Sequence, residues 1–294
     1  MPISRRQALE LVATATATAV AALAPDVSPA AVPVVAGRGN RGRAMVELPA
    51  RNELFVRLRG APAGRPALWW FTGSLWGKRT LDAARLLFRV EGCSFNTLLL
   101  EPDGGVRMTM IEIGFWLDPL TKQPADDWTN PMNGLKCAPV HFMGPQALRF
   151  DASGAGRPMA AVPSGTEFEG RITEPVTSGE RVWVGETLIV KGPGRASATG
   201  DPLQSGLPVF TATSLDTYEA SRRDLAAGAQ AWLPASRSYQ TLGSWYPWMR
   251  MGHEAGGISF QMVGSKLRTV DELPRELRTL IDTRQPGWIA QHSS

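Results

Sequence analysis

The stretch VRMTMIEIGFWLD, residues 106–118, decides the fold class of this chain. Side chains of a β-strand point alternately to its two faces, so every second residue shares a face. One face is apolar except for a single carboxylate: Met108, Met110, Glu112, Gly114 and Trp116. The other face is apolar throughout most of its length: Thr109, Ile111, Ile113, Phe115 and Leu117. A strand with two apolar faces is expected to be covered on both sides, which leaves Glu112 as the exception to be explained.

Six further segments share the character of this strand. They are short, rich in β-branched or aromatic residues, and mostly bounded by Pro, Gly, Asn or Asp. Their ranges are 85–92, 135–142, 166–173, 181–192, 207–220 and 256–264. The 30 glycines and 23 prolines of the chain suit a fold with many turns. The sequence therefore predicts a mainly β fold: a single antiparallel β-barrel-like or strongly curved sheet domain with a few short helices, including one near the C-terminus.

Two segments have helical periodicity. The weaker covers residues 221–233, and the stronger covers residues 270–282. The stronger segment has three leucines spaced to share one helix face: Leu273, Leu277 and Leu280. Asp271 is expected to cap this helix, since Pro274 is tolerated only in a first turn.

The N-terminus has the layout of an export signal. Ser4-Arg5-Arg6 precedes an apolar run rich in Ala and Thr, which ends in small residues at 22–24. Paired arginines before a mildly apolar run indicate the twin-arginine route. We expect a twin-arginine signal peptide at 1–24, a disordered tether at 25–43 and a single β-rich domain at 44–294. The alternative is a short N-terminal helix on the folded domain.

This layout predicts a periplasmic or secreted protein with the twin-arginine export machinery as a partner. No other window approaches the length of apolar sequence that a membrane span needs, so none is expected in the mature chain. The chain has 31 Lys and Arg against 27 Asp and Glu, a net charge of +4. Beyond the tether, basic and acidic residues are interspersed, so no dense basic stripe is present to bind phosphates, and we expect no nucleic-acid partner.

The sequence lacks the motifs that are typical of metal sites and of nucleotide-cofactor sites. Cys93 and Cys137 are the two cysteines, and both a disulfide and two buried thiols are compatible with an exported chain. No Cys-x-x-Cys or His-x-x-x-His spacing occurs. The glycine-rich segment 192–200 lacks dinucleotide-binding spacing, and no Gly-x-Ser-x-Gly motif occurs. We expect no metal and no cofactor.

Glu112 and His141 are the candidate catalytic residues. A carboxylate among methionine and tryptophan side chains has a raised pKa unless it is paired, and such a group suits general acid–base chemistry. The alternative for Glu112 is an internal ion pair with an arginine. His141 lies on the strand predicted at 135–142, and pairing with the 106–118 strand would bring it near Glu112. The alternative for His141 is a core position satisfied by a backbone carbonyl.

The segment LDPLTKQPADDWTNPMNG, residues 117–134, is predicted to connect these two strands. Asn130, Pro131 and Gly134 mark a structural turn, and Asn133-Gly134 suits a type I′ hairpin. The segment also holds a group of oxygen-bearing side chains: Asp126, Asp127 and Asn130. These lack the register of a calcium loop, which favours solvated loop acids.

The segment SWYPWMRMGHEAGG, residues 244–257, is dense in aromatic and sulfur-containing side chains. Such side chains form apolar walls that accommodate flat ligands, and Pro247 excludes a helix interior. The predicted ligand-binding residues are Trp116, Trp245, Tyr246, Trp248, Met251 and His253. The alternatives are a core plug that closes one end of a barrel for the rings, and a plain surface position for His253. Arg250 and Lys266 are possible anion clamps at the rim of the same pocket.

Four of these segments, in this order and spacing, resemble the domain of unknown function family 1838. They are LFRVEG, the Glu112 strand, the 117–134 segment leading to VHF, and SWYPWMRMGHEAGGISFQMVGSK followed by DELP. The most specific pieces are the Asn-Pro-x-x-Gly turn at 130–134 and the Trp-x-Pro-Trp-Met-x-Met-Gly block at 245–252. Asn133 stands where the family usually has Thr. The resemblance implies a shared fold and a shared pocket, and it brings no assigned activity.

Three functions remain open at this point. The first is a cofactor-independent acid–base enzyme, of isomerase, cyclase or lyase type, on a hydrophobic or aromatic small molecule. The second is a non-catalytic periplasmic carrier of a hydrophobic ligand. The third is an oligomeric envelope interaction protein, although the sequence does not give the oligomeric state. A raised pKa at Glu112 would favour the enzyme, a lowered pKa the carrier, and an exposed tryptophan face the assembly.

Overall fold

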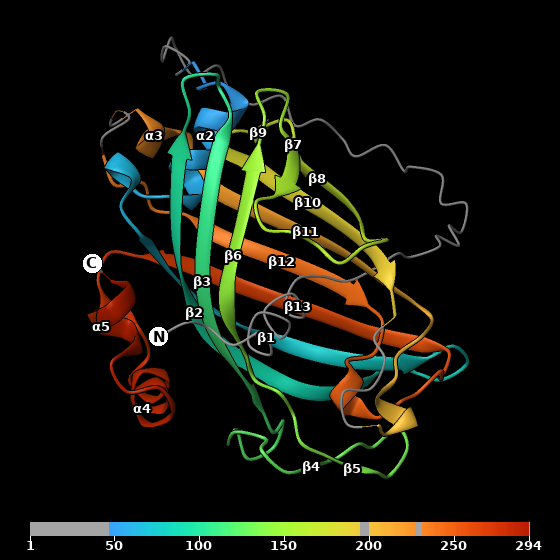
Figure 1. Cartoon of the computed structure of the whole chain (residues 1–294). Coiled ribbons are helices and arrows are strands. Elements are labelled where there is room, and N and C mark those ends of the chain that lie inside the picture. Colours follow the sequence, from blue (N-terminus) through green and yellow to red (C-terminus); the bar gives the residue numbers. More distant parts are fainter. Residues whose placement is uncertain (1–46, 195–199, 227, 229–230, 294) are drawn as a thin grey trace, which may run out of the picture.

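A ten-stranded antiparallel barrel dominates the computed structural model of this chain, which describes residues 47–194, 200–226, 228 and 231–293 (Figure 1). In order of pairing, the strands are β11 (Val209–Ser221), β12 (Ser236–Gly243), β13 (Gly256–Leu267), β1 (Ala67–Arg79), β2 (Arg85–Leu100), β3 (Val106–Leu117), β6 (Phe142–Phe150), β7 (Ala155–Pro158), β8 (Glu167–Ile172) and β10 (Arg181–Pro193). Pairing of β10 with β11 closes the ring. The signal peptide predicted at 1–24 and the tether predicted at 25–43 lie outside the described residues.

The remaining elements are short. Strand β9 (Val176–Ser178) pairs with β10, and β4 (Trp128–Thr129) forms a small hairpin with β5 (Lys136–Cys137). The helices are α2 (Arg51–Arg59), α3 (Arg222–Leu225), α4 (Arg275–Arg284) and α5 (Trp288–His292). The 3-10 turns are η2 (Pro62–Gly64), η3 (Pro202–Gln204), η4 (Pro247–Met249) and η5 (Val270–Glu272).

The mainly β fold with a helix near the C-terminus is confirmed, and three local predictions are wrong. The segment 135–142 is not one strand, because β5 ends at Cys137 and β6 begins at Phe142. The predicted helix at 221–233 is described as helix only in α3. The C-terminal helix begins at Arg275 with Pro274 at its N-cap, in place of Asp271. A proline disfavours helical backbone at the residue before it, so the helix cannot extend back to Asp271.

The turn at 130–134 also differs from the predicted type I′ hairpin. That turn needs positive φ at both central residues, whereas Gly134 has a φ of 74° and Asn133 is not among the positive-φ residues. The backbone N–H of Gly134 donates to the carbonyl oxygen of Asn130 at 2.7 Å, and the turn joins β4 to β5, not two long strands.

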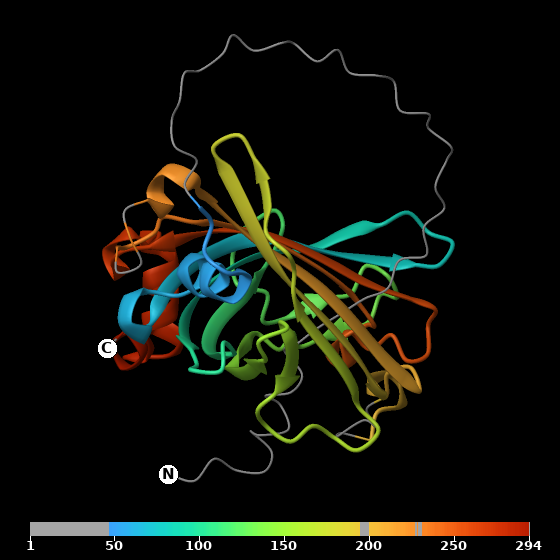
Figure 2. The ribbon, with the colours of Figure 1, turned by 90° about the horizontal axis from the view of Figure 1, so that it is seen from above.

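Side chains that point into the barrel form two apolar layers. The first fills the end that α2 enters, where Leu54, Phe55 and Leu58 of α2 are fully buried against the inner wall (Figure 2). The second fills the opposite end, beside η4 and the β4–β5 hairpin at the bottom of Figure 1. Helix α2 has nine residues, and a helix this short would be only marginally stable in isolation. Its stability therefore derives from this packing.

Two paired glycines allow aromatic rings to lie flat on the inner wall. Gly92 of β2 lies directly opposite Gly114 of β3. A Cβ at Gly92 would stand 2.6 Å from Phe71 Cζ, and a Cβ at Gly114 would stand 2.0 Å from Phe142 Cζ. The rings of Phe71 and Phe142 are stacked with centroids 6.0 Å apart. Any side chain at either glycine would therefore displace a ring that fills the second apolar layer.

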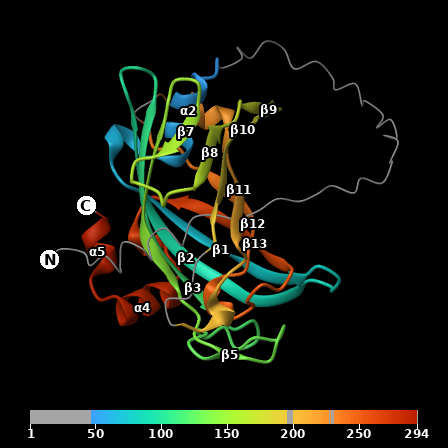
Figure 3. The same ribbon diagram turned by 45° about the vertical axis from the view of Figure 1, so that its right-hand side comes forward.

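The outer face of β1–β3 is covered by α4 and α5 (Figure 3). Leu277 and Ile281 of α4 are buried there against Ile113 and Phe115 of β3, so β3 is covered on both faces over this part, as its sequence predicts. Ile281, not Leu280, is the third fully buried residue of the helix stripe. Cys93 is buried under these helices, whereas Cys137 is buried at the far end of the barrel, and both are free thiols.

Lys266 of β13 anchors the C-terminal end of α2 inside the barrel. Its ammonium group donates to the carbonyl oxygens of Arg57, Leu58 and Gly60 at 3.0, 2.8 and 2.9 Å. Trp69 Nε1 donates to the carbonyl oxygen of Arg59 at 2.8 Å. A helix end leaves its last carbonyl oxygens without partners, and burial makes that costly, so these side chains are what permit a helix to end here. The prediction that Lys266 lies at a pocket rim is therefore wrong.

Replacing this lysine tests the anchor. Lys266→Met keeps the length of the side chain and removes three hydrogen bonds to buried carbonyl oxygens, so we expect the free energy of unfolding to fall by about 3 kcal/mol. Urea unfolding followed by tryptophan fluorescence measures the change. Lys191→Met is the matched control, because Lys191 is exposed and forms a surface ion pair with Glu167, so the substitution should change stability little. Equal stability of the two variants would contradict the anchoring role.

Candidate functional site

A belt of polar and charged side chains crosses the barrel between its two apolar layers. Two buried ion pairs form its framework: Arg59 of α2 with Glu186 of β10, and Arg237 of β12 with Asp216 of β11. All four side chains are at most 6% exposed. Charges buried this deeply require direct partners, because each one loses its hydration.

Further hydrogen bonds complete the two pairs. Arg237 contacts both carboxylate oxygens of Asp216, at 2.9 and 2.8 Å, and Tyr218 donates its hydroxyl to Asp216 at 2.6 Å. Arg59 also donates to Asn96 Oδ1 at 3.2 Å and lies 5.2 Å from the centroid of the Tyr218 ring. Both guanidinium groups are thus committed to carboxylates other than Glu112.

Glu112 points into this belt from β3 without a direct partner. The described residues offer its carboxyl group neither a hydrogen bond nor an ion pair, and the side chain is partly exposed. Burial raises the pKa of Glu112 to about 7, against the attraction of Arg237 and Arg59, and the charge of Asp216 raises it further. A carboxyl group with this pKa can both give and accept a proton near neutral pH.

Two tyrosines share the electrostatic environment of Glu112. Burial raises the pKa of Tyr239 on β12 to about 12, and it raises the pKa of Tyr246 still further. The charge of Glu112 contributes to both shifts, so the three groups lie within electrostatic range of one another. Both hydroxyl groups therefore remain protonated at neutral pH and can donate hydrogen bonds.

Aromatic rings form the wall below these polar groups. Trp116 is central: its ring centroid lies 5.1 Å from that of Phe142, 5.7 Å from that of Tyr246 and 5.8 Å from that of Phe260. Tyr239 lies against Phe260 with centroids 5.8 Å apart. These distances are typical of packed aromatic pairs, and the barrel with its aromatic clusters is compatible with a pocket for a hydrophobic ligand.

Solvent reaches the belt on the β6 side of the barrel. Ser94 and Asn96, the inward residues of β2 beside Glu112, are at most 1% exposed. In contrast, Phe142 and Gln146, the inward residues of β6 on the other side, are partly exposed. Strand β6 pairs with β7 only over residues 148–150, so residues 142–146 have β3 as their one strand partner in the described chain. The inward side chains beside this free edge are therefore more exposed than those of β2.

His141 lies on the outside of the barrel, away from Glu112. Its Nδ1 accepts a hydrogen bond from the backbone N–H of Trp116 at 3.0 Å, and its Nε2 lies 3.1 Å from Asp126 Oδ1. Asp126 in turn binds Arg284 of α4. Burial lowers the pKa of His141, and the role of Nδ1 as acceptor places the proton on Nε2, which donates to Asp126. The arrangement fastens α4 to the connection between β3 and β6, and the structure does not bring His141 together with Glu112.

The predicted aromatic residues divide between core and pocket wall. Trp116, Trp245 and Met251 are buried, whereas Tyr246 and Trp248 are partly exposed and stack with centroids 5.7 Å apart. The indoles of Trp116 and Trp245 donate to the carbonyl oxygens of Val140 and Glu254, which fixes their orientation. His253 is exposed in the turn that follows.

The structural turn packs against this aromatic block. Asn130 donates to the carbonyl oxygen of Met249 at 2.7 Å, and Asn133 donates to that of Arg250 at 2.9 Å. Pro131 accepts a hydrogen bond from Arg85 at 3.1 Å, and Gly134 supplies the positive φ that ends the turn. Arg250 donates to Asp201 and to the carbonyl oxygen of Lys136, so this guanidinium holds the end of the barrel together.

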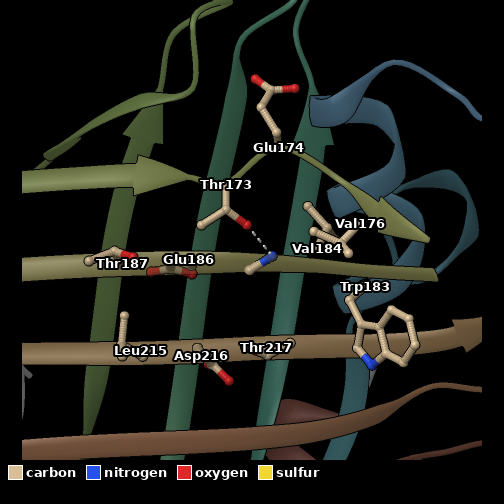
Figure 4. Close-up of a pocket in the computed structure, with 11 residues that line it drawn as sticks. Thr173, Glu174, Val176, Trp183, Val184, Glu186, Thr187, Leu215, Asp216 and Thr217 are labelled. Atoms are coloured by element: carbon tan, nitrogen blue, oxygen red, sulfur yellow. Dashed lines mark hydrogen bonds between the residues drawn. The ribbon is translucent and has the colours of Figure 1, made fainter. Parts of the chain in front are cut away.

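A shallow hollow of about 190 Å³ lies on the outer wall, where residues 173–176 pass β10 and β11 (Figure 4). Thr173 accepts a hydrogen bond from the backbone N–H of Gly185 at 2.9 Å and forms one side. The exposed side chains of Val176 and Leu215 line it beside Trp183. Glu186 and Asp216 lie on strands that border the hollow, but arginines bind their carboxyl groups in the interior of the barrel. The titratable groups therefore converge in the belt and not in the hollow.

The sequence analysis did not identify Arg59, Arg237 or Tyr239 as site residues. Arg237 and Tyr239 lie on β12, which was not predicted, although Arg237, Tyr239 and Thr241 alternate with small or polar residues at strand spacing. Glu186 carries the same signal as Glu112, a single carboxylate in the middle of a mainly apolar strand. Among the described residues, no three His, Cys, Asp or Glu side chains gather to form a metal site.

The pH dependence of stability tests the environment of Glu112. Its pKa is about 7 in the folded protein against an ordinary value of 4.5, so the folded state binds more protons between these values. The stability that the protonated group contributes is complete below pH 4.5 and is lost as the pH rises through 7. Glu112→Gln stays neutral, so it should match the parent protein near pH 4 and exceed it at pH 8 by about 3 kcal/mol, since one pKa unit corresponds to about 1.4 kcal/mol.

Urea unfolding at a series of pH values measures this difference. Glu169→Gln is the control, because Glu169 is exposed on the outer face of β8 and should give no gain that grows with pH. A difference between Glu112→Gln and the parent that does not change from pH 4 to pH 8 would contradict the assigned environment.

Comparison with known proteins supports the resemblance noted in the sequence. None of the described helices has the length and apolar character needed to cross a membrane. No curated protein and no solved structure matches the chain. The model of the DUF1838 family, described as a protein of unknown function, matches residues 64–293, which include all ten barrel strands and the aromatic block. The chain therefore belongs to the DUF1838 family.

Proposed function

We propose that this protein is an enzyme that binds a hydrophobic or aromatic small molecule inside the barrel and transfers protons through Glu112. The observation that carries the proposal is the carboxyl group of Glu112, which has no direct partner, a pKa of about 7 and an aromatic wall beside it. Isomerase, cyclase or lyase chemistry fits, because each needs a group that takes and returns a proton.

The charge balance of the belt supports an acid–base role over a structural one. An internal ion pair was the alternative for Glu112, and such pairs form elsewhere in the belt, at Arg59–Glu186 and Arg237–Asp216. Glu112 is the carboxyl group left without a guanidinium. A residue that served only stability would gain from a partner or from replacement by an apolar side chain, so an unpaired and partly exposed carboxyl group points to chemistry.

The two alternative functions receive less support. An envelope assembly protein would present tryptophans on its surface, but all ten tryptophans of the chain are buried or partly buried. A carrier would use the same aromatic pocket without turnover. It would gain nothing from a pKa of about 7 at Glu112, because an uncharged side chain would bind an apolar ligand as well.

Native mass spectrometry of the purified protein tests the pocket, beside denaturing mass spectrometry of a solvent extract. We expect an organic adduct that is lost in Trp248→Ala, because that ring lines the accessible part of the aromatic wall. Trp183→Ala is the matched control: it removes a tryptophan of similar exposure from the outer wall and should keep the adduct. Loss of the adduct in Trp183→Ala but not in Trp248→Ala would contradict an interior site.

The same measurement separates enzyme from carrier. Glu112→Gln is nearly isosteric and removes the titrating group. Substrate should accumulate on this variant if the residue acts in turnover, so the mass of its adduct should differ from that of the parent protein, which binds product as well. An identical adduct at equal occupancy on both proteins would favour the carrier.

We further propose that the chain is exported by the twin-arginine route. The support is the Ser4-Arg5-Arg6 motif and the apolar run after it. Replacing both Arg5 and Arg6 by lysine should leave the precursor in the cytoplasm, as measured by fractionation and by mass spectrometry of the N-terminus. Lys substitution at Arg38 and Arg41 in the predicted tether is the control and should leave export intact. Normal export of the Arg5→Lys/Arg6→Lys variant would contradict the route.

A further inference from the structure

Two hydroxyl groups in the belt have protons without an acceptor in the described part of the chain. The hydroxyl oxygen of Tyr239 accepts a hydrogen bond from Thr241 Oγ1 at 2.8 Å, so one hydrogen bond serves two hydroxyl groups and one proton is left over. The hydroxyl group of Tyr246 makes no hydrogen bond with the described residues, although its ring packs against Trp116 and Trp248. Both side chains are partly exposed, so each hydroxyl group is free to donate a hydrogen bond to a bound molecule.

The surroundings strengthen both groups as donors. The guanidinium carbon of Arg237 lies 5.3 Å from the centroid of the Tyr239 ring. Both tyrosines stay protonated at neutral pH, because burial raises the pKa of each. A positive charge behind a protonated hydroxyl stabilises negative charge that develops on an oxygen in front of it.

Glu112 lies on the same face of β3 as Trp116, whose ring packs against Tyr246, but it does not itself accept these protons from the described tyrosines. Its charge acts on both tyrosines, yet it forms a hydrogen bond with neither. A group bound between them would therefore contact hydroxyl donors on one side and a carboxylate base on the other. The aromatic rings of Phe142, Trp116 and Phe260 border this space, which favours a flat and mainly apolar molecule.

We propose that the substrate is a flat cyclic ketone with an acidic C–H next to its carbonyl group, and that Tyr239 and Tyr246 bind the carbonyl oxygen while Glu112 faces the adjacent carbon. This proposal rests on the proposed function and names its substrate class. It follows from two hydroxyl protons without an acceptor and a carboxyl group without a partner among the described residues, all beside the rings of Trp116 and Phe260.

The chemical step is a proton transfer that balances without any co-reactant. The carboxylate of Glu112 takes a proton from the carbon beside the carbonyl group. The electron pair of that C–H bond forms a C=C bond, and the carbonyl π pair moves onto oxygen, where the two tyrosine hydroxyls stabilise the enolate. Return of the proton from Glu112 to the same or another carbon gives back the ketone or an isomer.

Hydrogen–deuterium exchange of 2-tetralone tests the step. In D₂O the protein should speed the incorporation of deuterium at the carbon beside the carbonyl group. NMR measures the rate of incorporation. Glu112→Gln should lower the rate by about 100-fold or more, and Tyr239→Phe and Tyr246→Phe by about 10-fold each, in the range that general bases and single hydrogen-bond donors contribute. Trp183→Ala, on the outer wall, is the control and should catalyse exchange at the rate of the parent protein. Tyr218→Phe is not a suitable control, because Tyr218 donates a hydrogen bond to Asp216.

Binding of two probes separates failure of this proposal from failure of the proposed function. Naphthalene measures the apolar pocket alone, and 2-naphthol adds an oxygen that mimics the enolate. We expect 2-naphthol to bind about 10-fold more tightly, and Tyr246→Phe to abolish that difference while the affinity for naphthalene stays the same.

Each outcome has one meaning. Equal binding of naphthalene and 2-naphthol would overturn the carbonyl site and leave the pocket standing. Tighter binding of 2-naphthol without exchange of 2-tetralone would overturn the proton-transfer step. Binding of neither probe, by a protein that unfolds cooperatively, would overturn both this proposal and the proposed function.

Discussion

The ion pair between Arg59 and Glu186 is the interaction on which the interior of the barrel depends. It joins α2, which fills one end, to β10, which closes the ring, and both side chains are almost fully buried. A buried guanidinium needs a carboxylate, and a buried carboxylate needs a cation. With Arg237 and Asp216 bound to each other, two cations are matched by two anions, and Glu112 is a third carboxyl group. Glu112 has no such partner among the described residues, and burial raises its pKa to about 7.

Within the barrel, the residues that stabilise the fold are different from the candidate catalytic residue Glu112. The apolar layers at the two ends stabilise the barrel mainly through aliphatic and aromatic side chains, and the charged side chains of the two ion pairs between them are paired with each other. Glu112 forms no hydrogen bond or ion pair with the described residues, so a change in its protonation breaks no such contact. The inward side chains of Phe142 and Gln146 on the neighbouring strand β6 are partly exposed, as Glu112 is.

The sequence was sufficient for the fold class and for Glu112, and insufficient for the composition of the site. Alternation along β3 predicted both faces of that strand, because period two is a property of the strand itself. Arg59 could not be found in this way, since α2 is short and its helical state depends on packing inside a barrel that the sequence does not display. His141 was paired with Glu112 on the assumption that residues 135–142 form one strand. The chain instead leaves β5 at Cys137, so His141 arrives beside the backbone of Trp116 on the opposite face.

The free edge of β6 has a consequence for the behaviour of the protein in concentrated solution. An unpaired strand edge offers backbone groups to which a second chain can add, and such edges promote aggregation. Pro145 lies in the middle of this edge and has no N–H to offer, and Gly144 beside it is a poor strand former. Both residues therefore disfavour the addition of a strand from another copy at this edge.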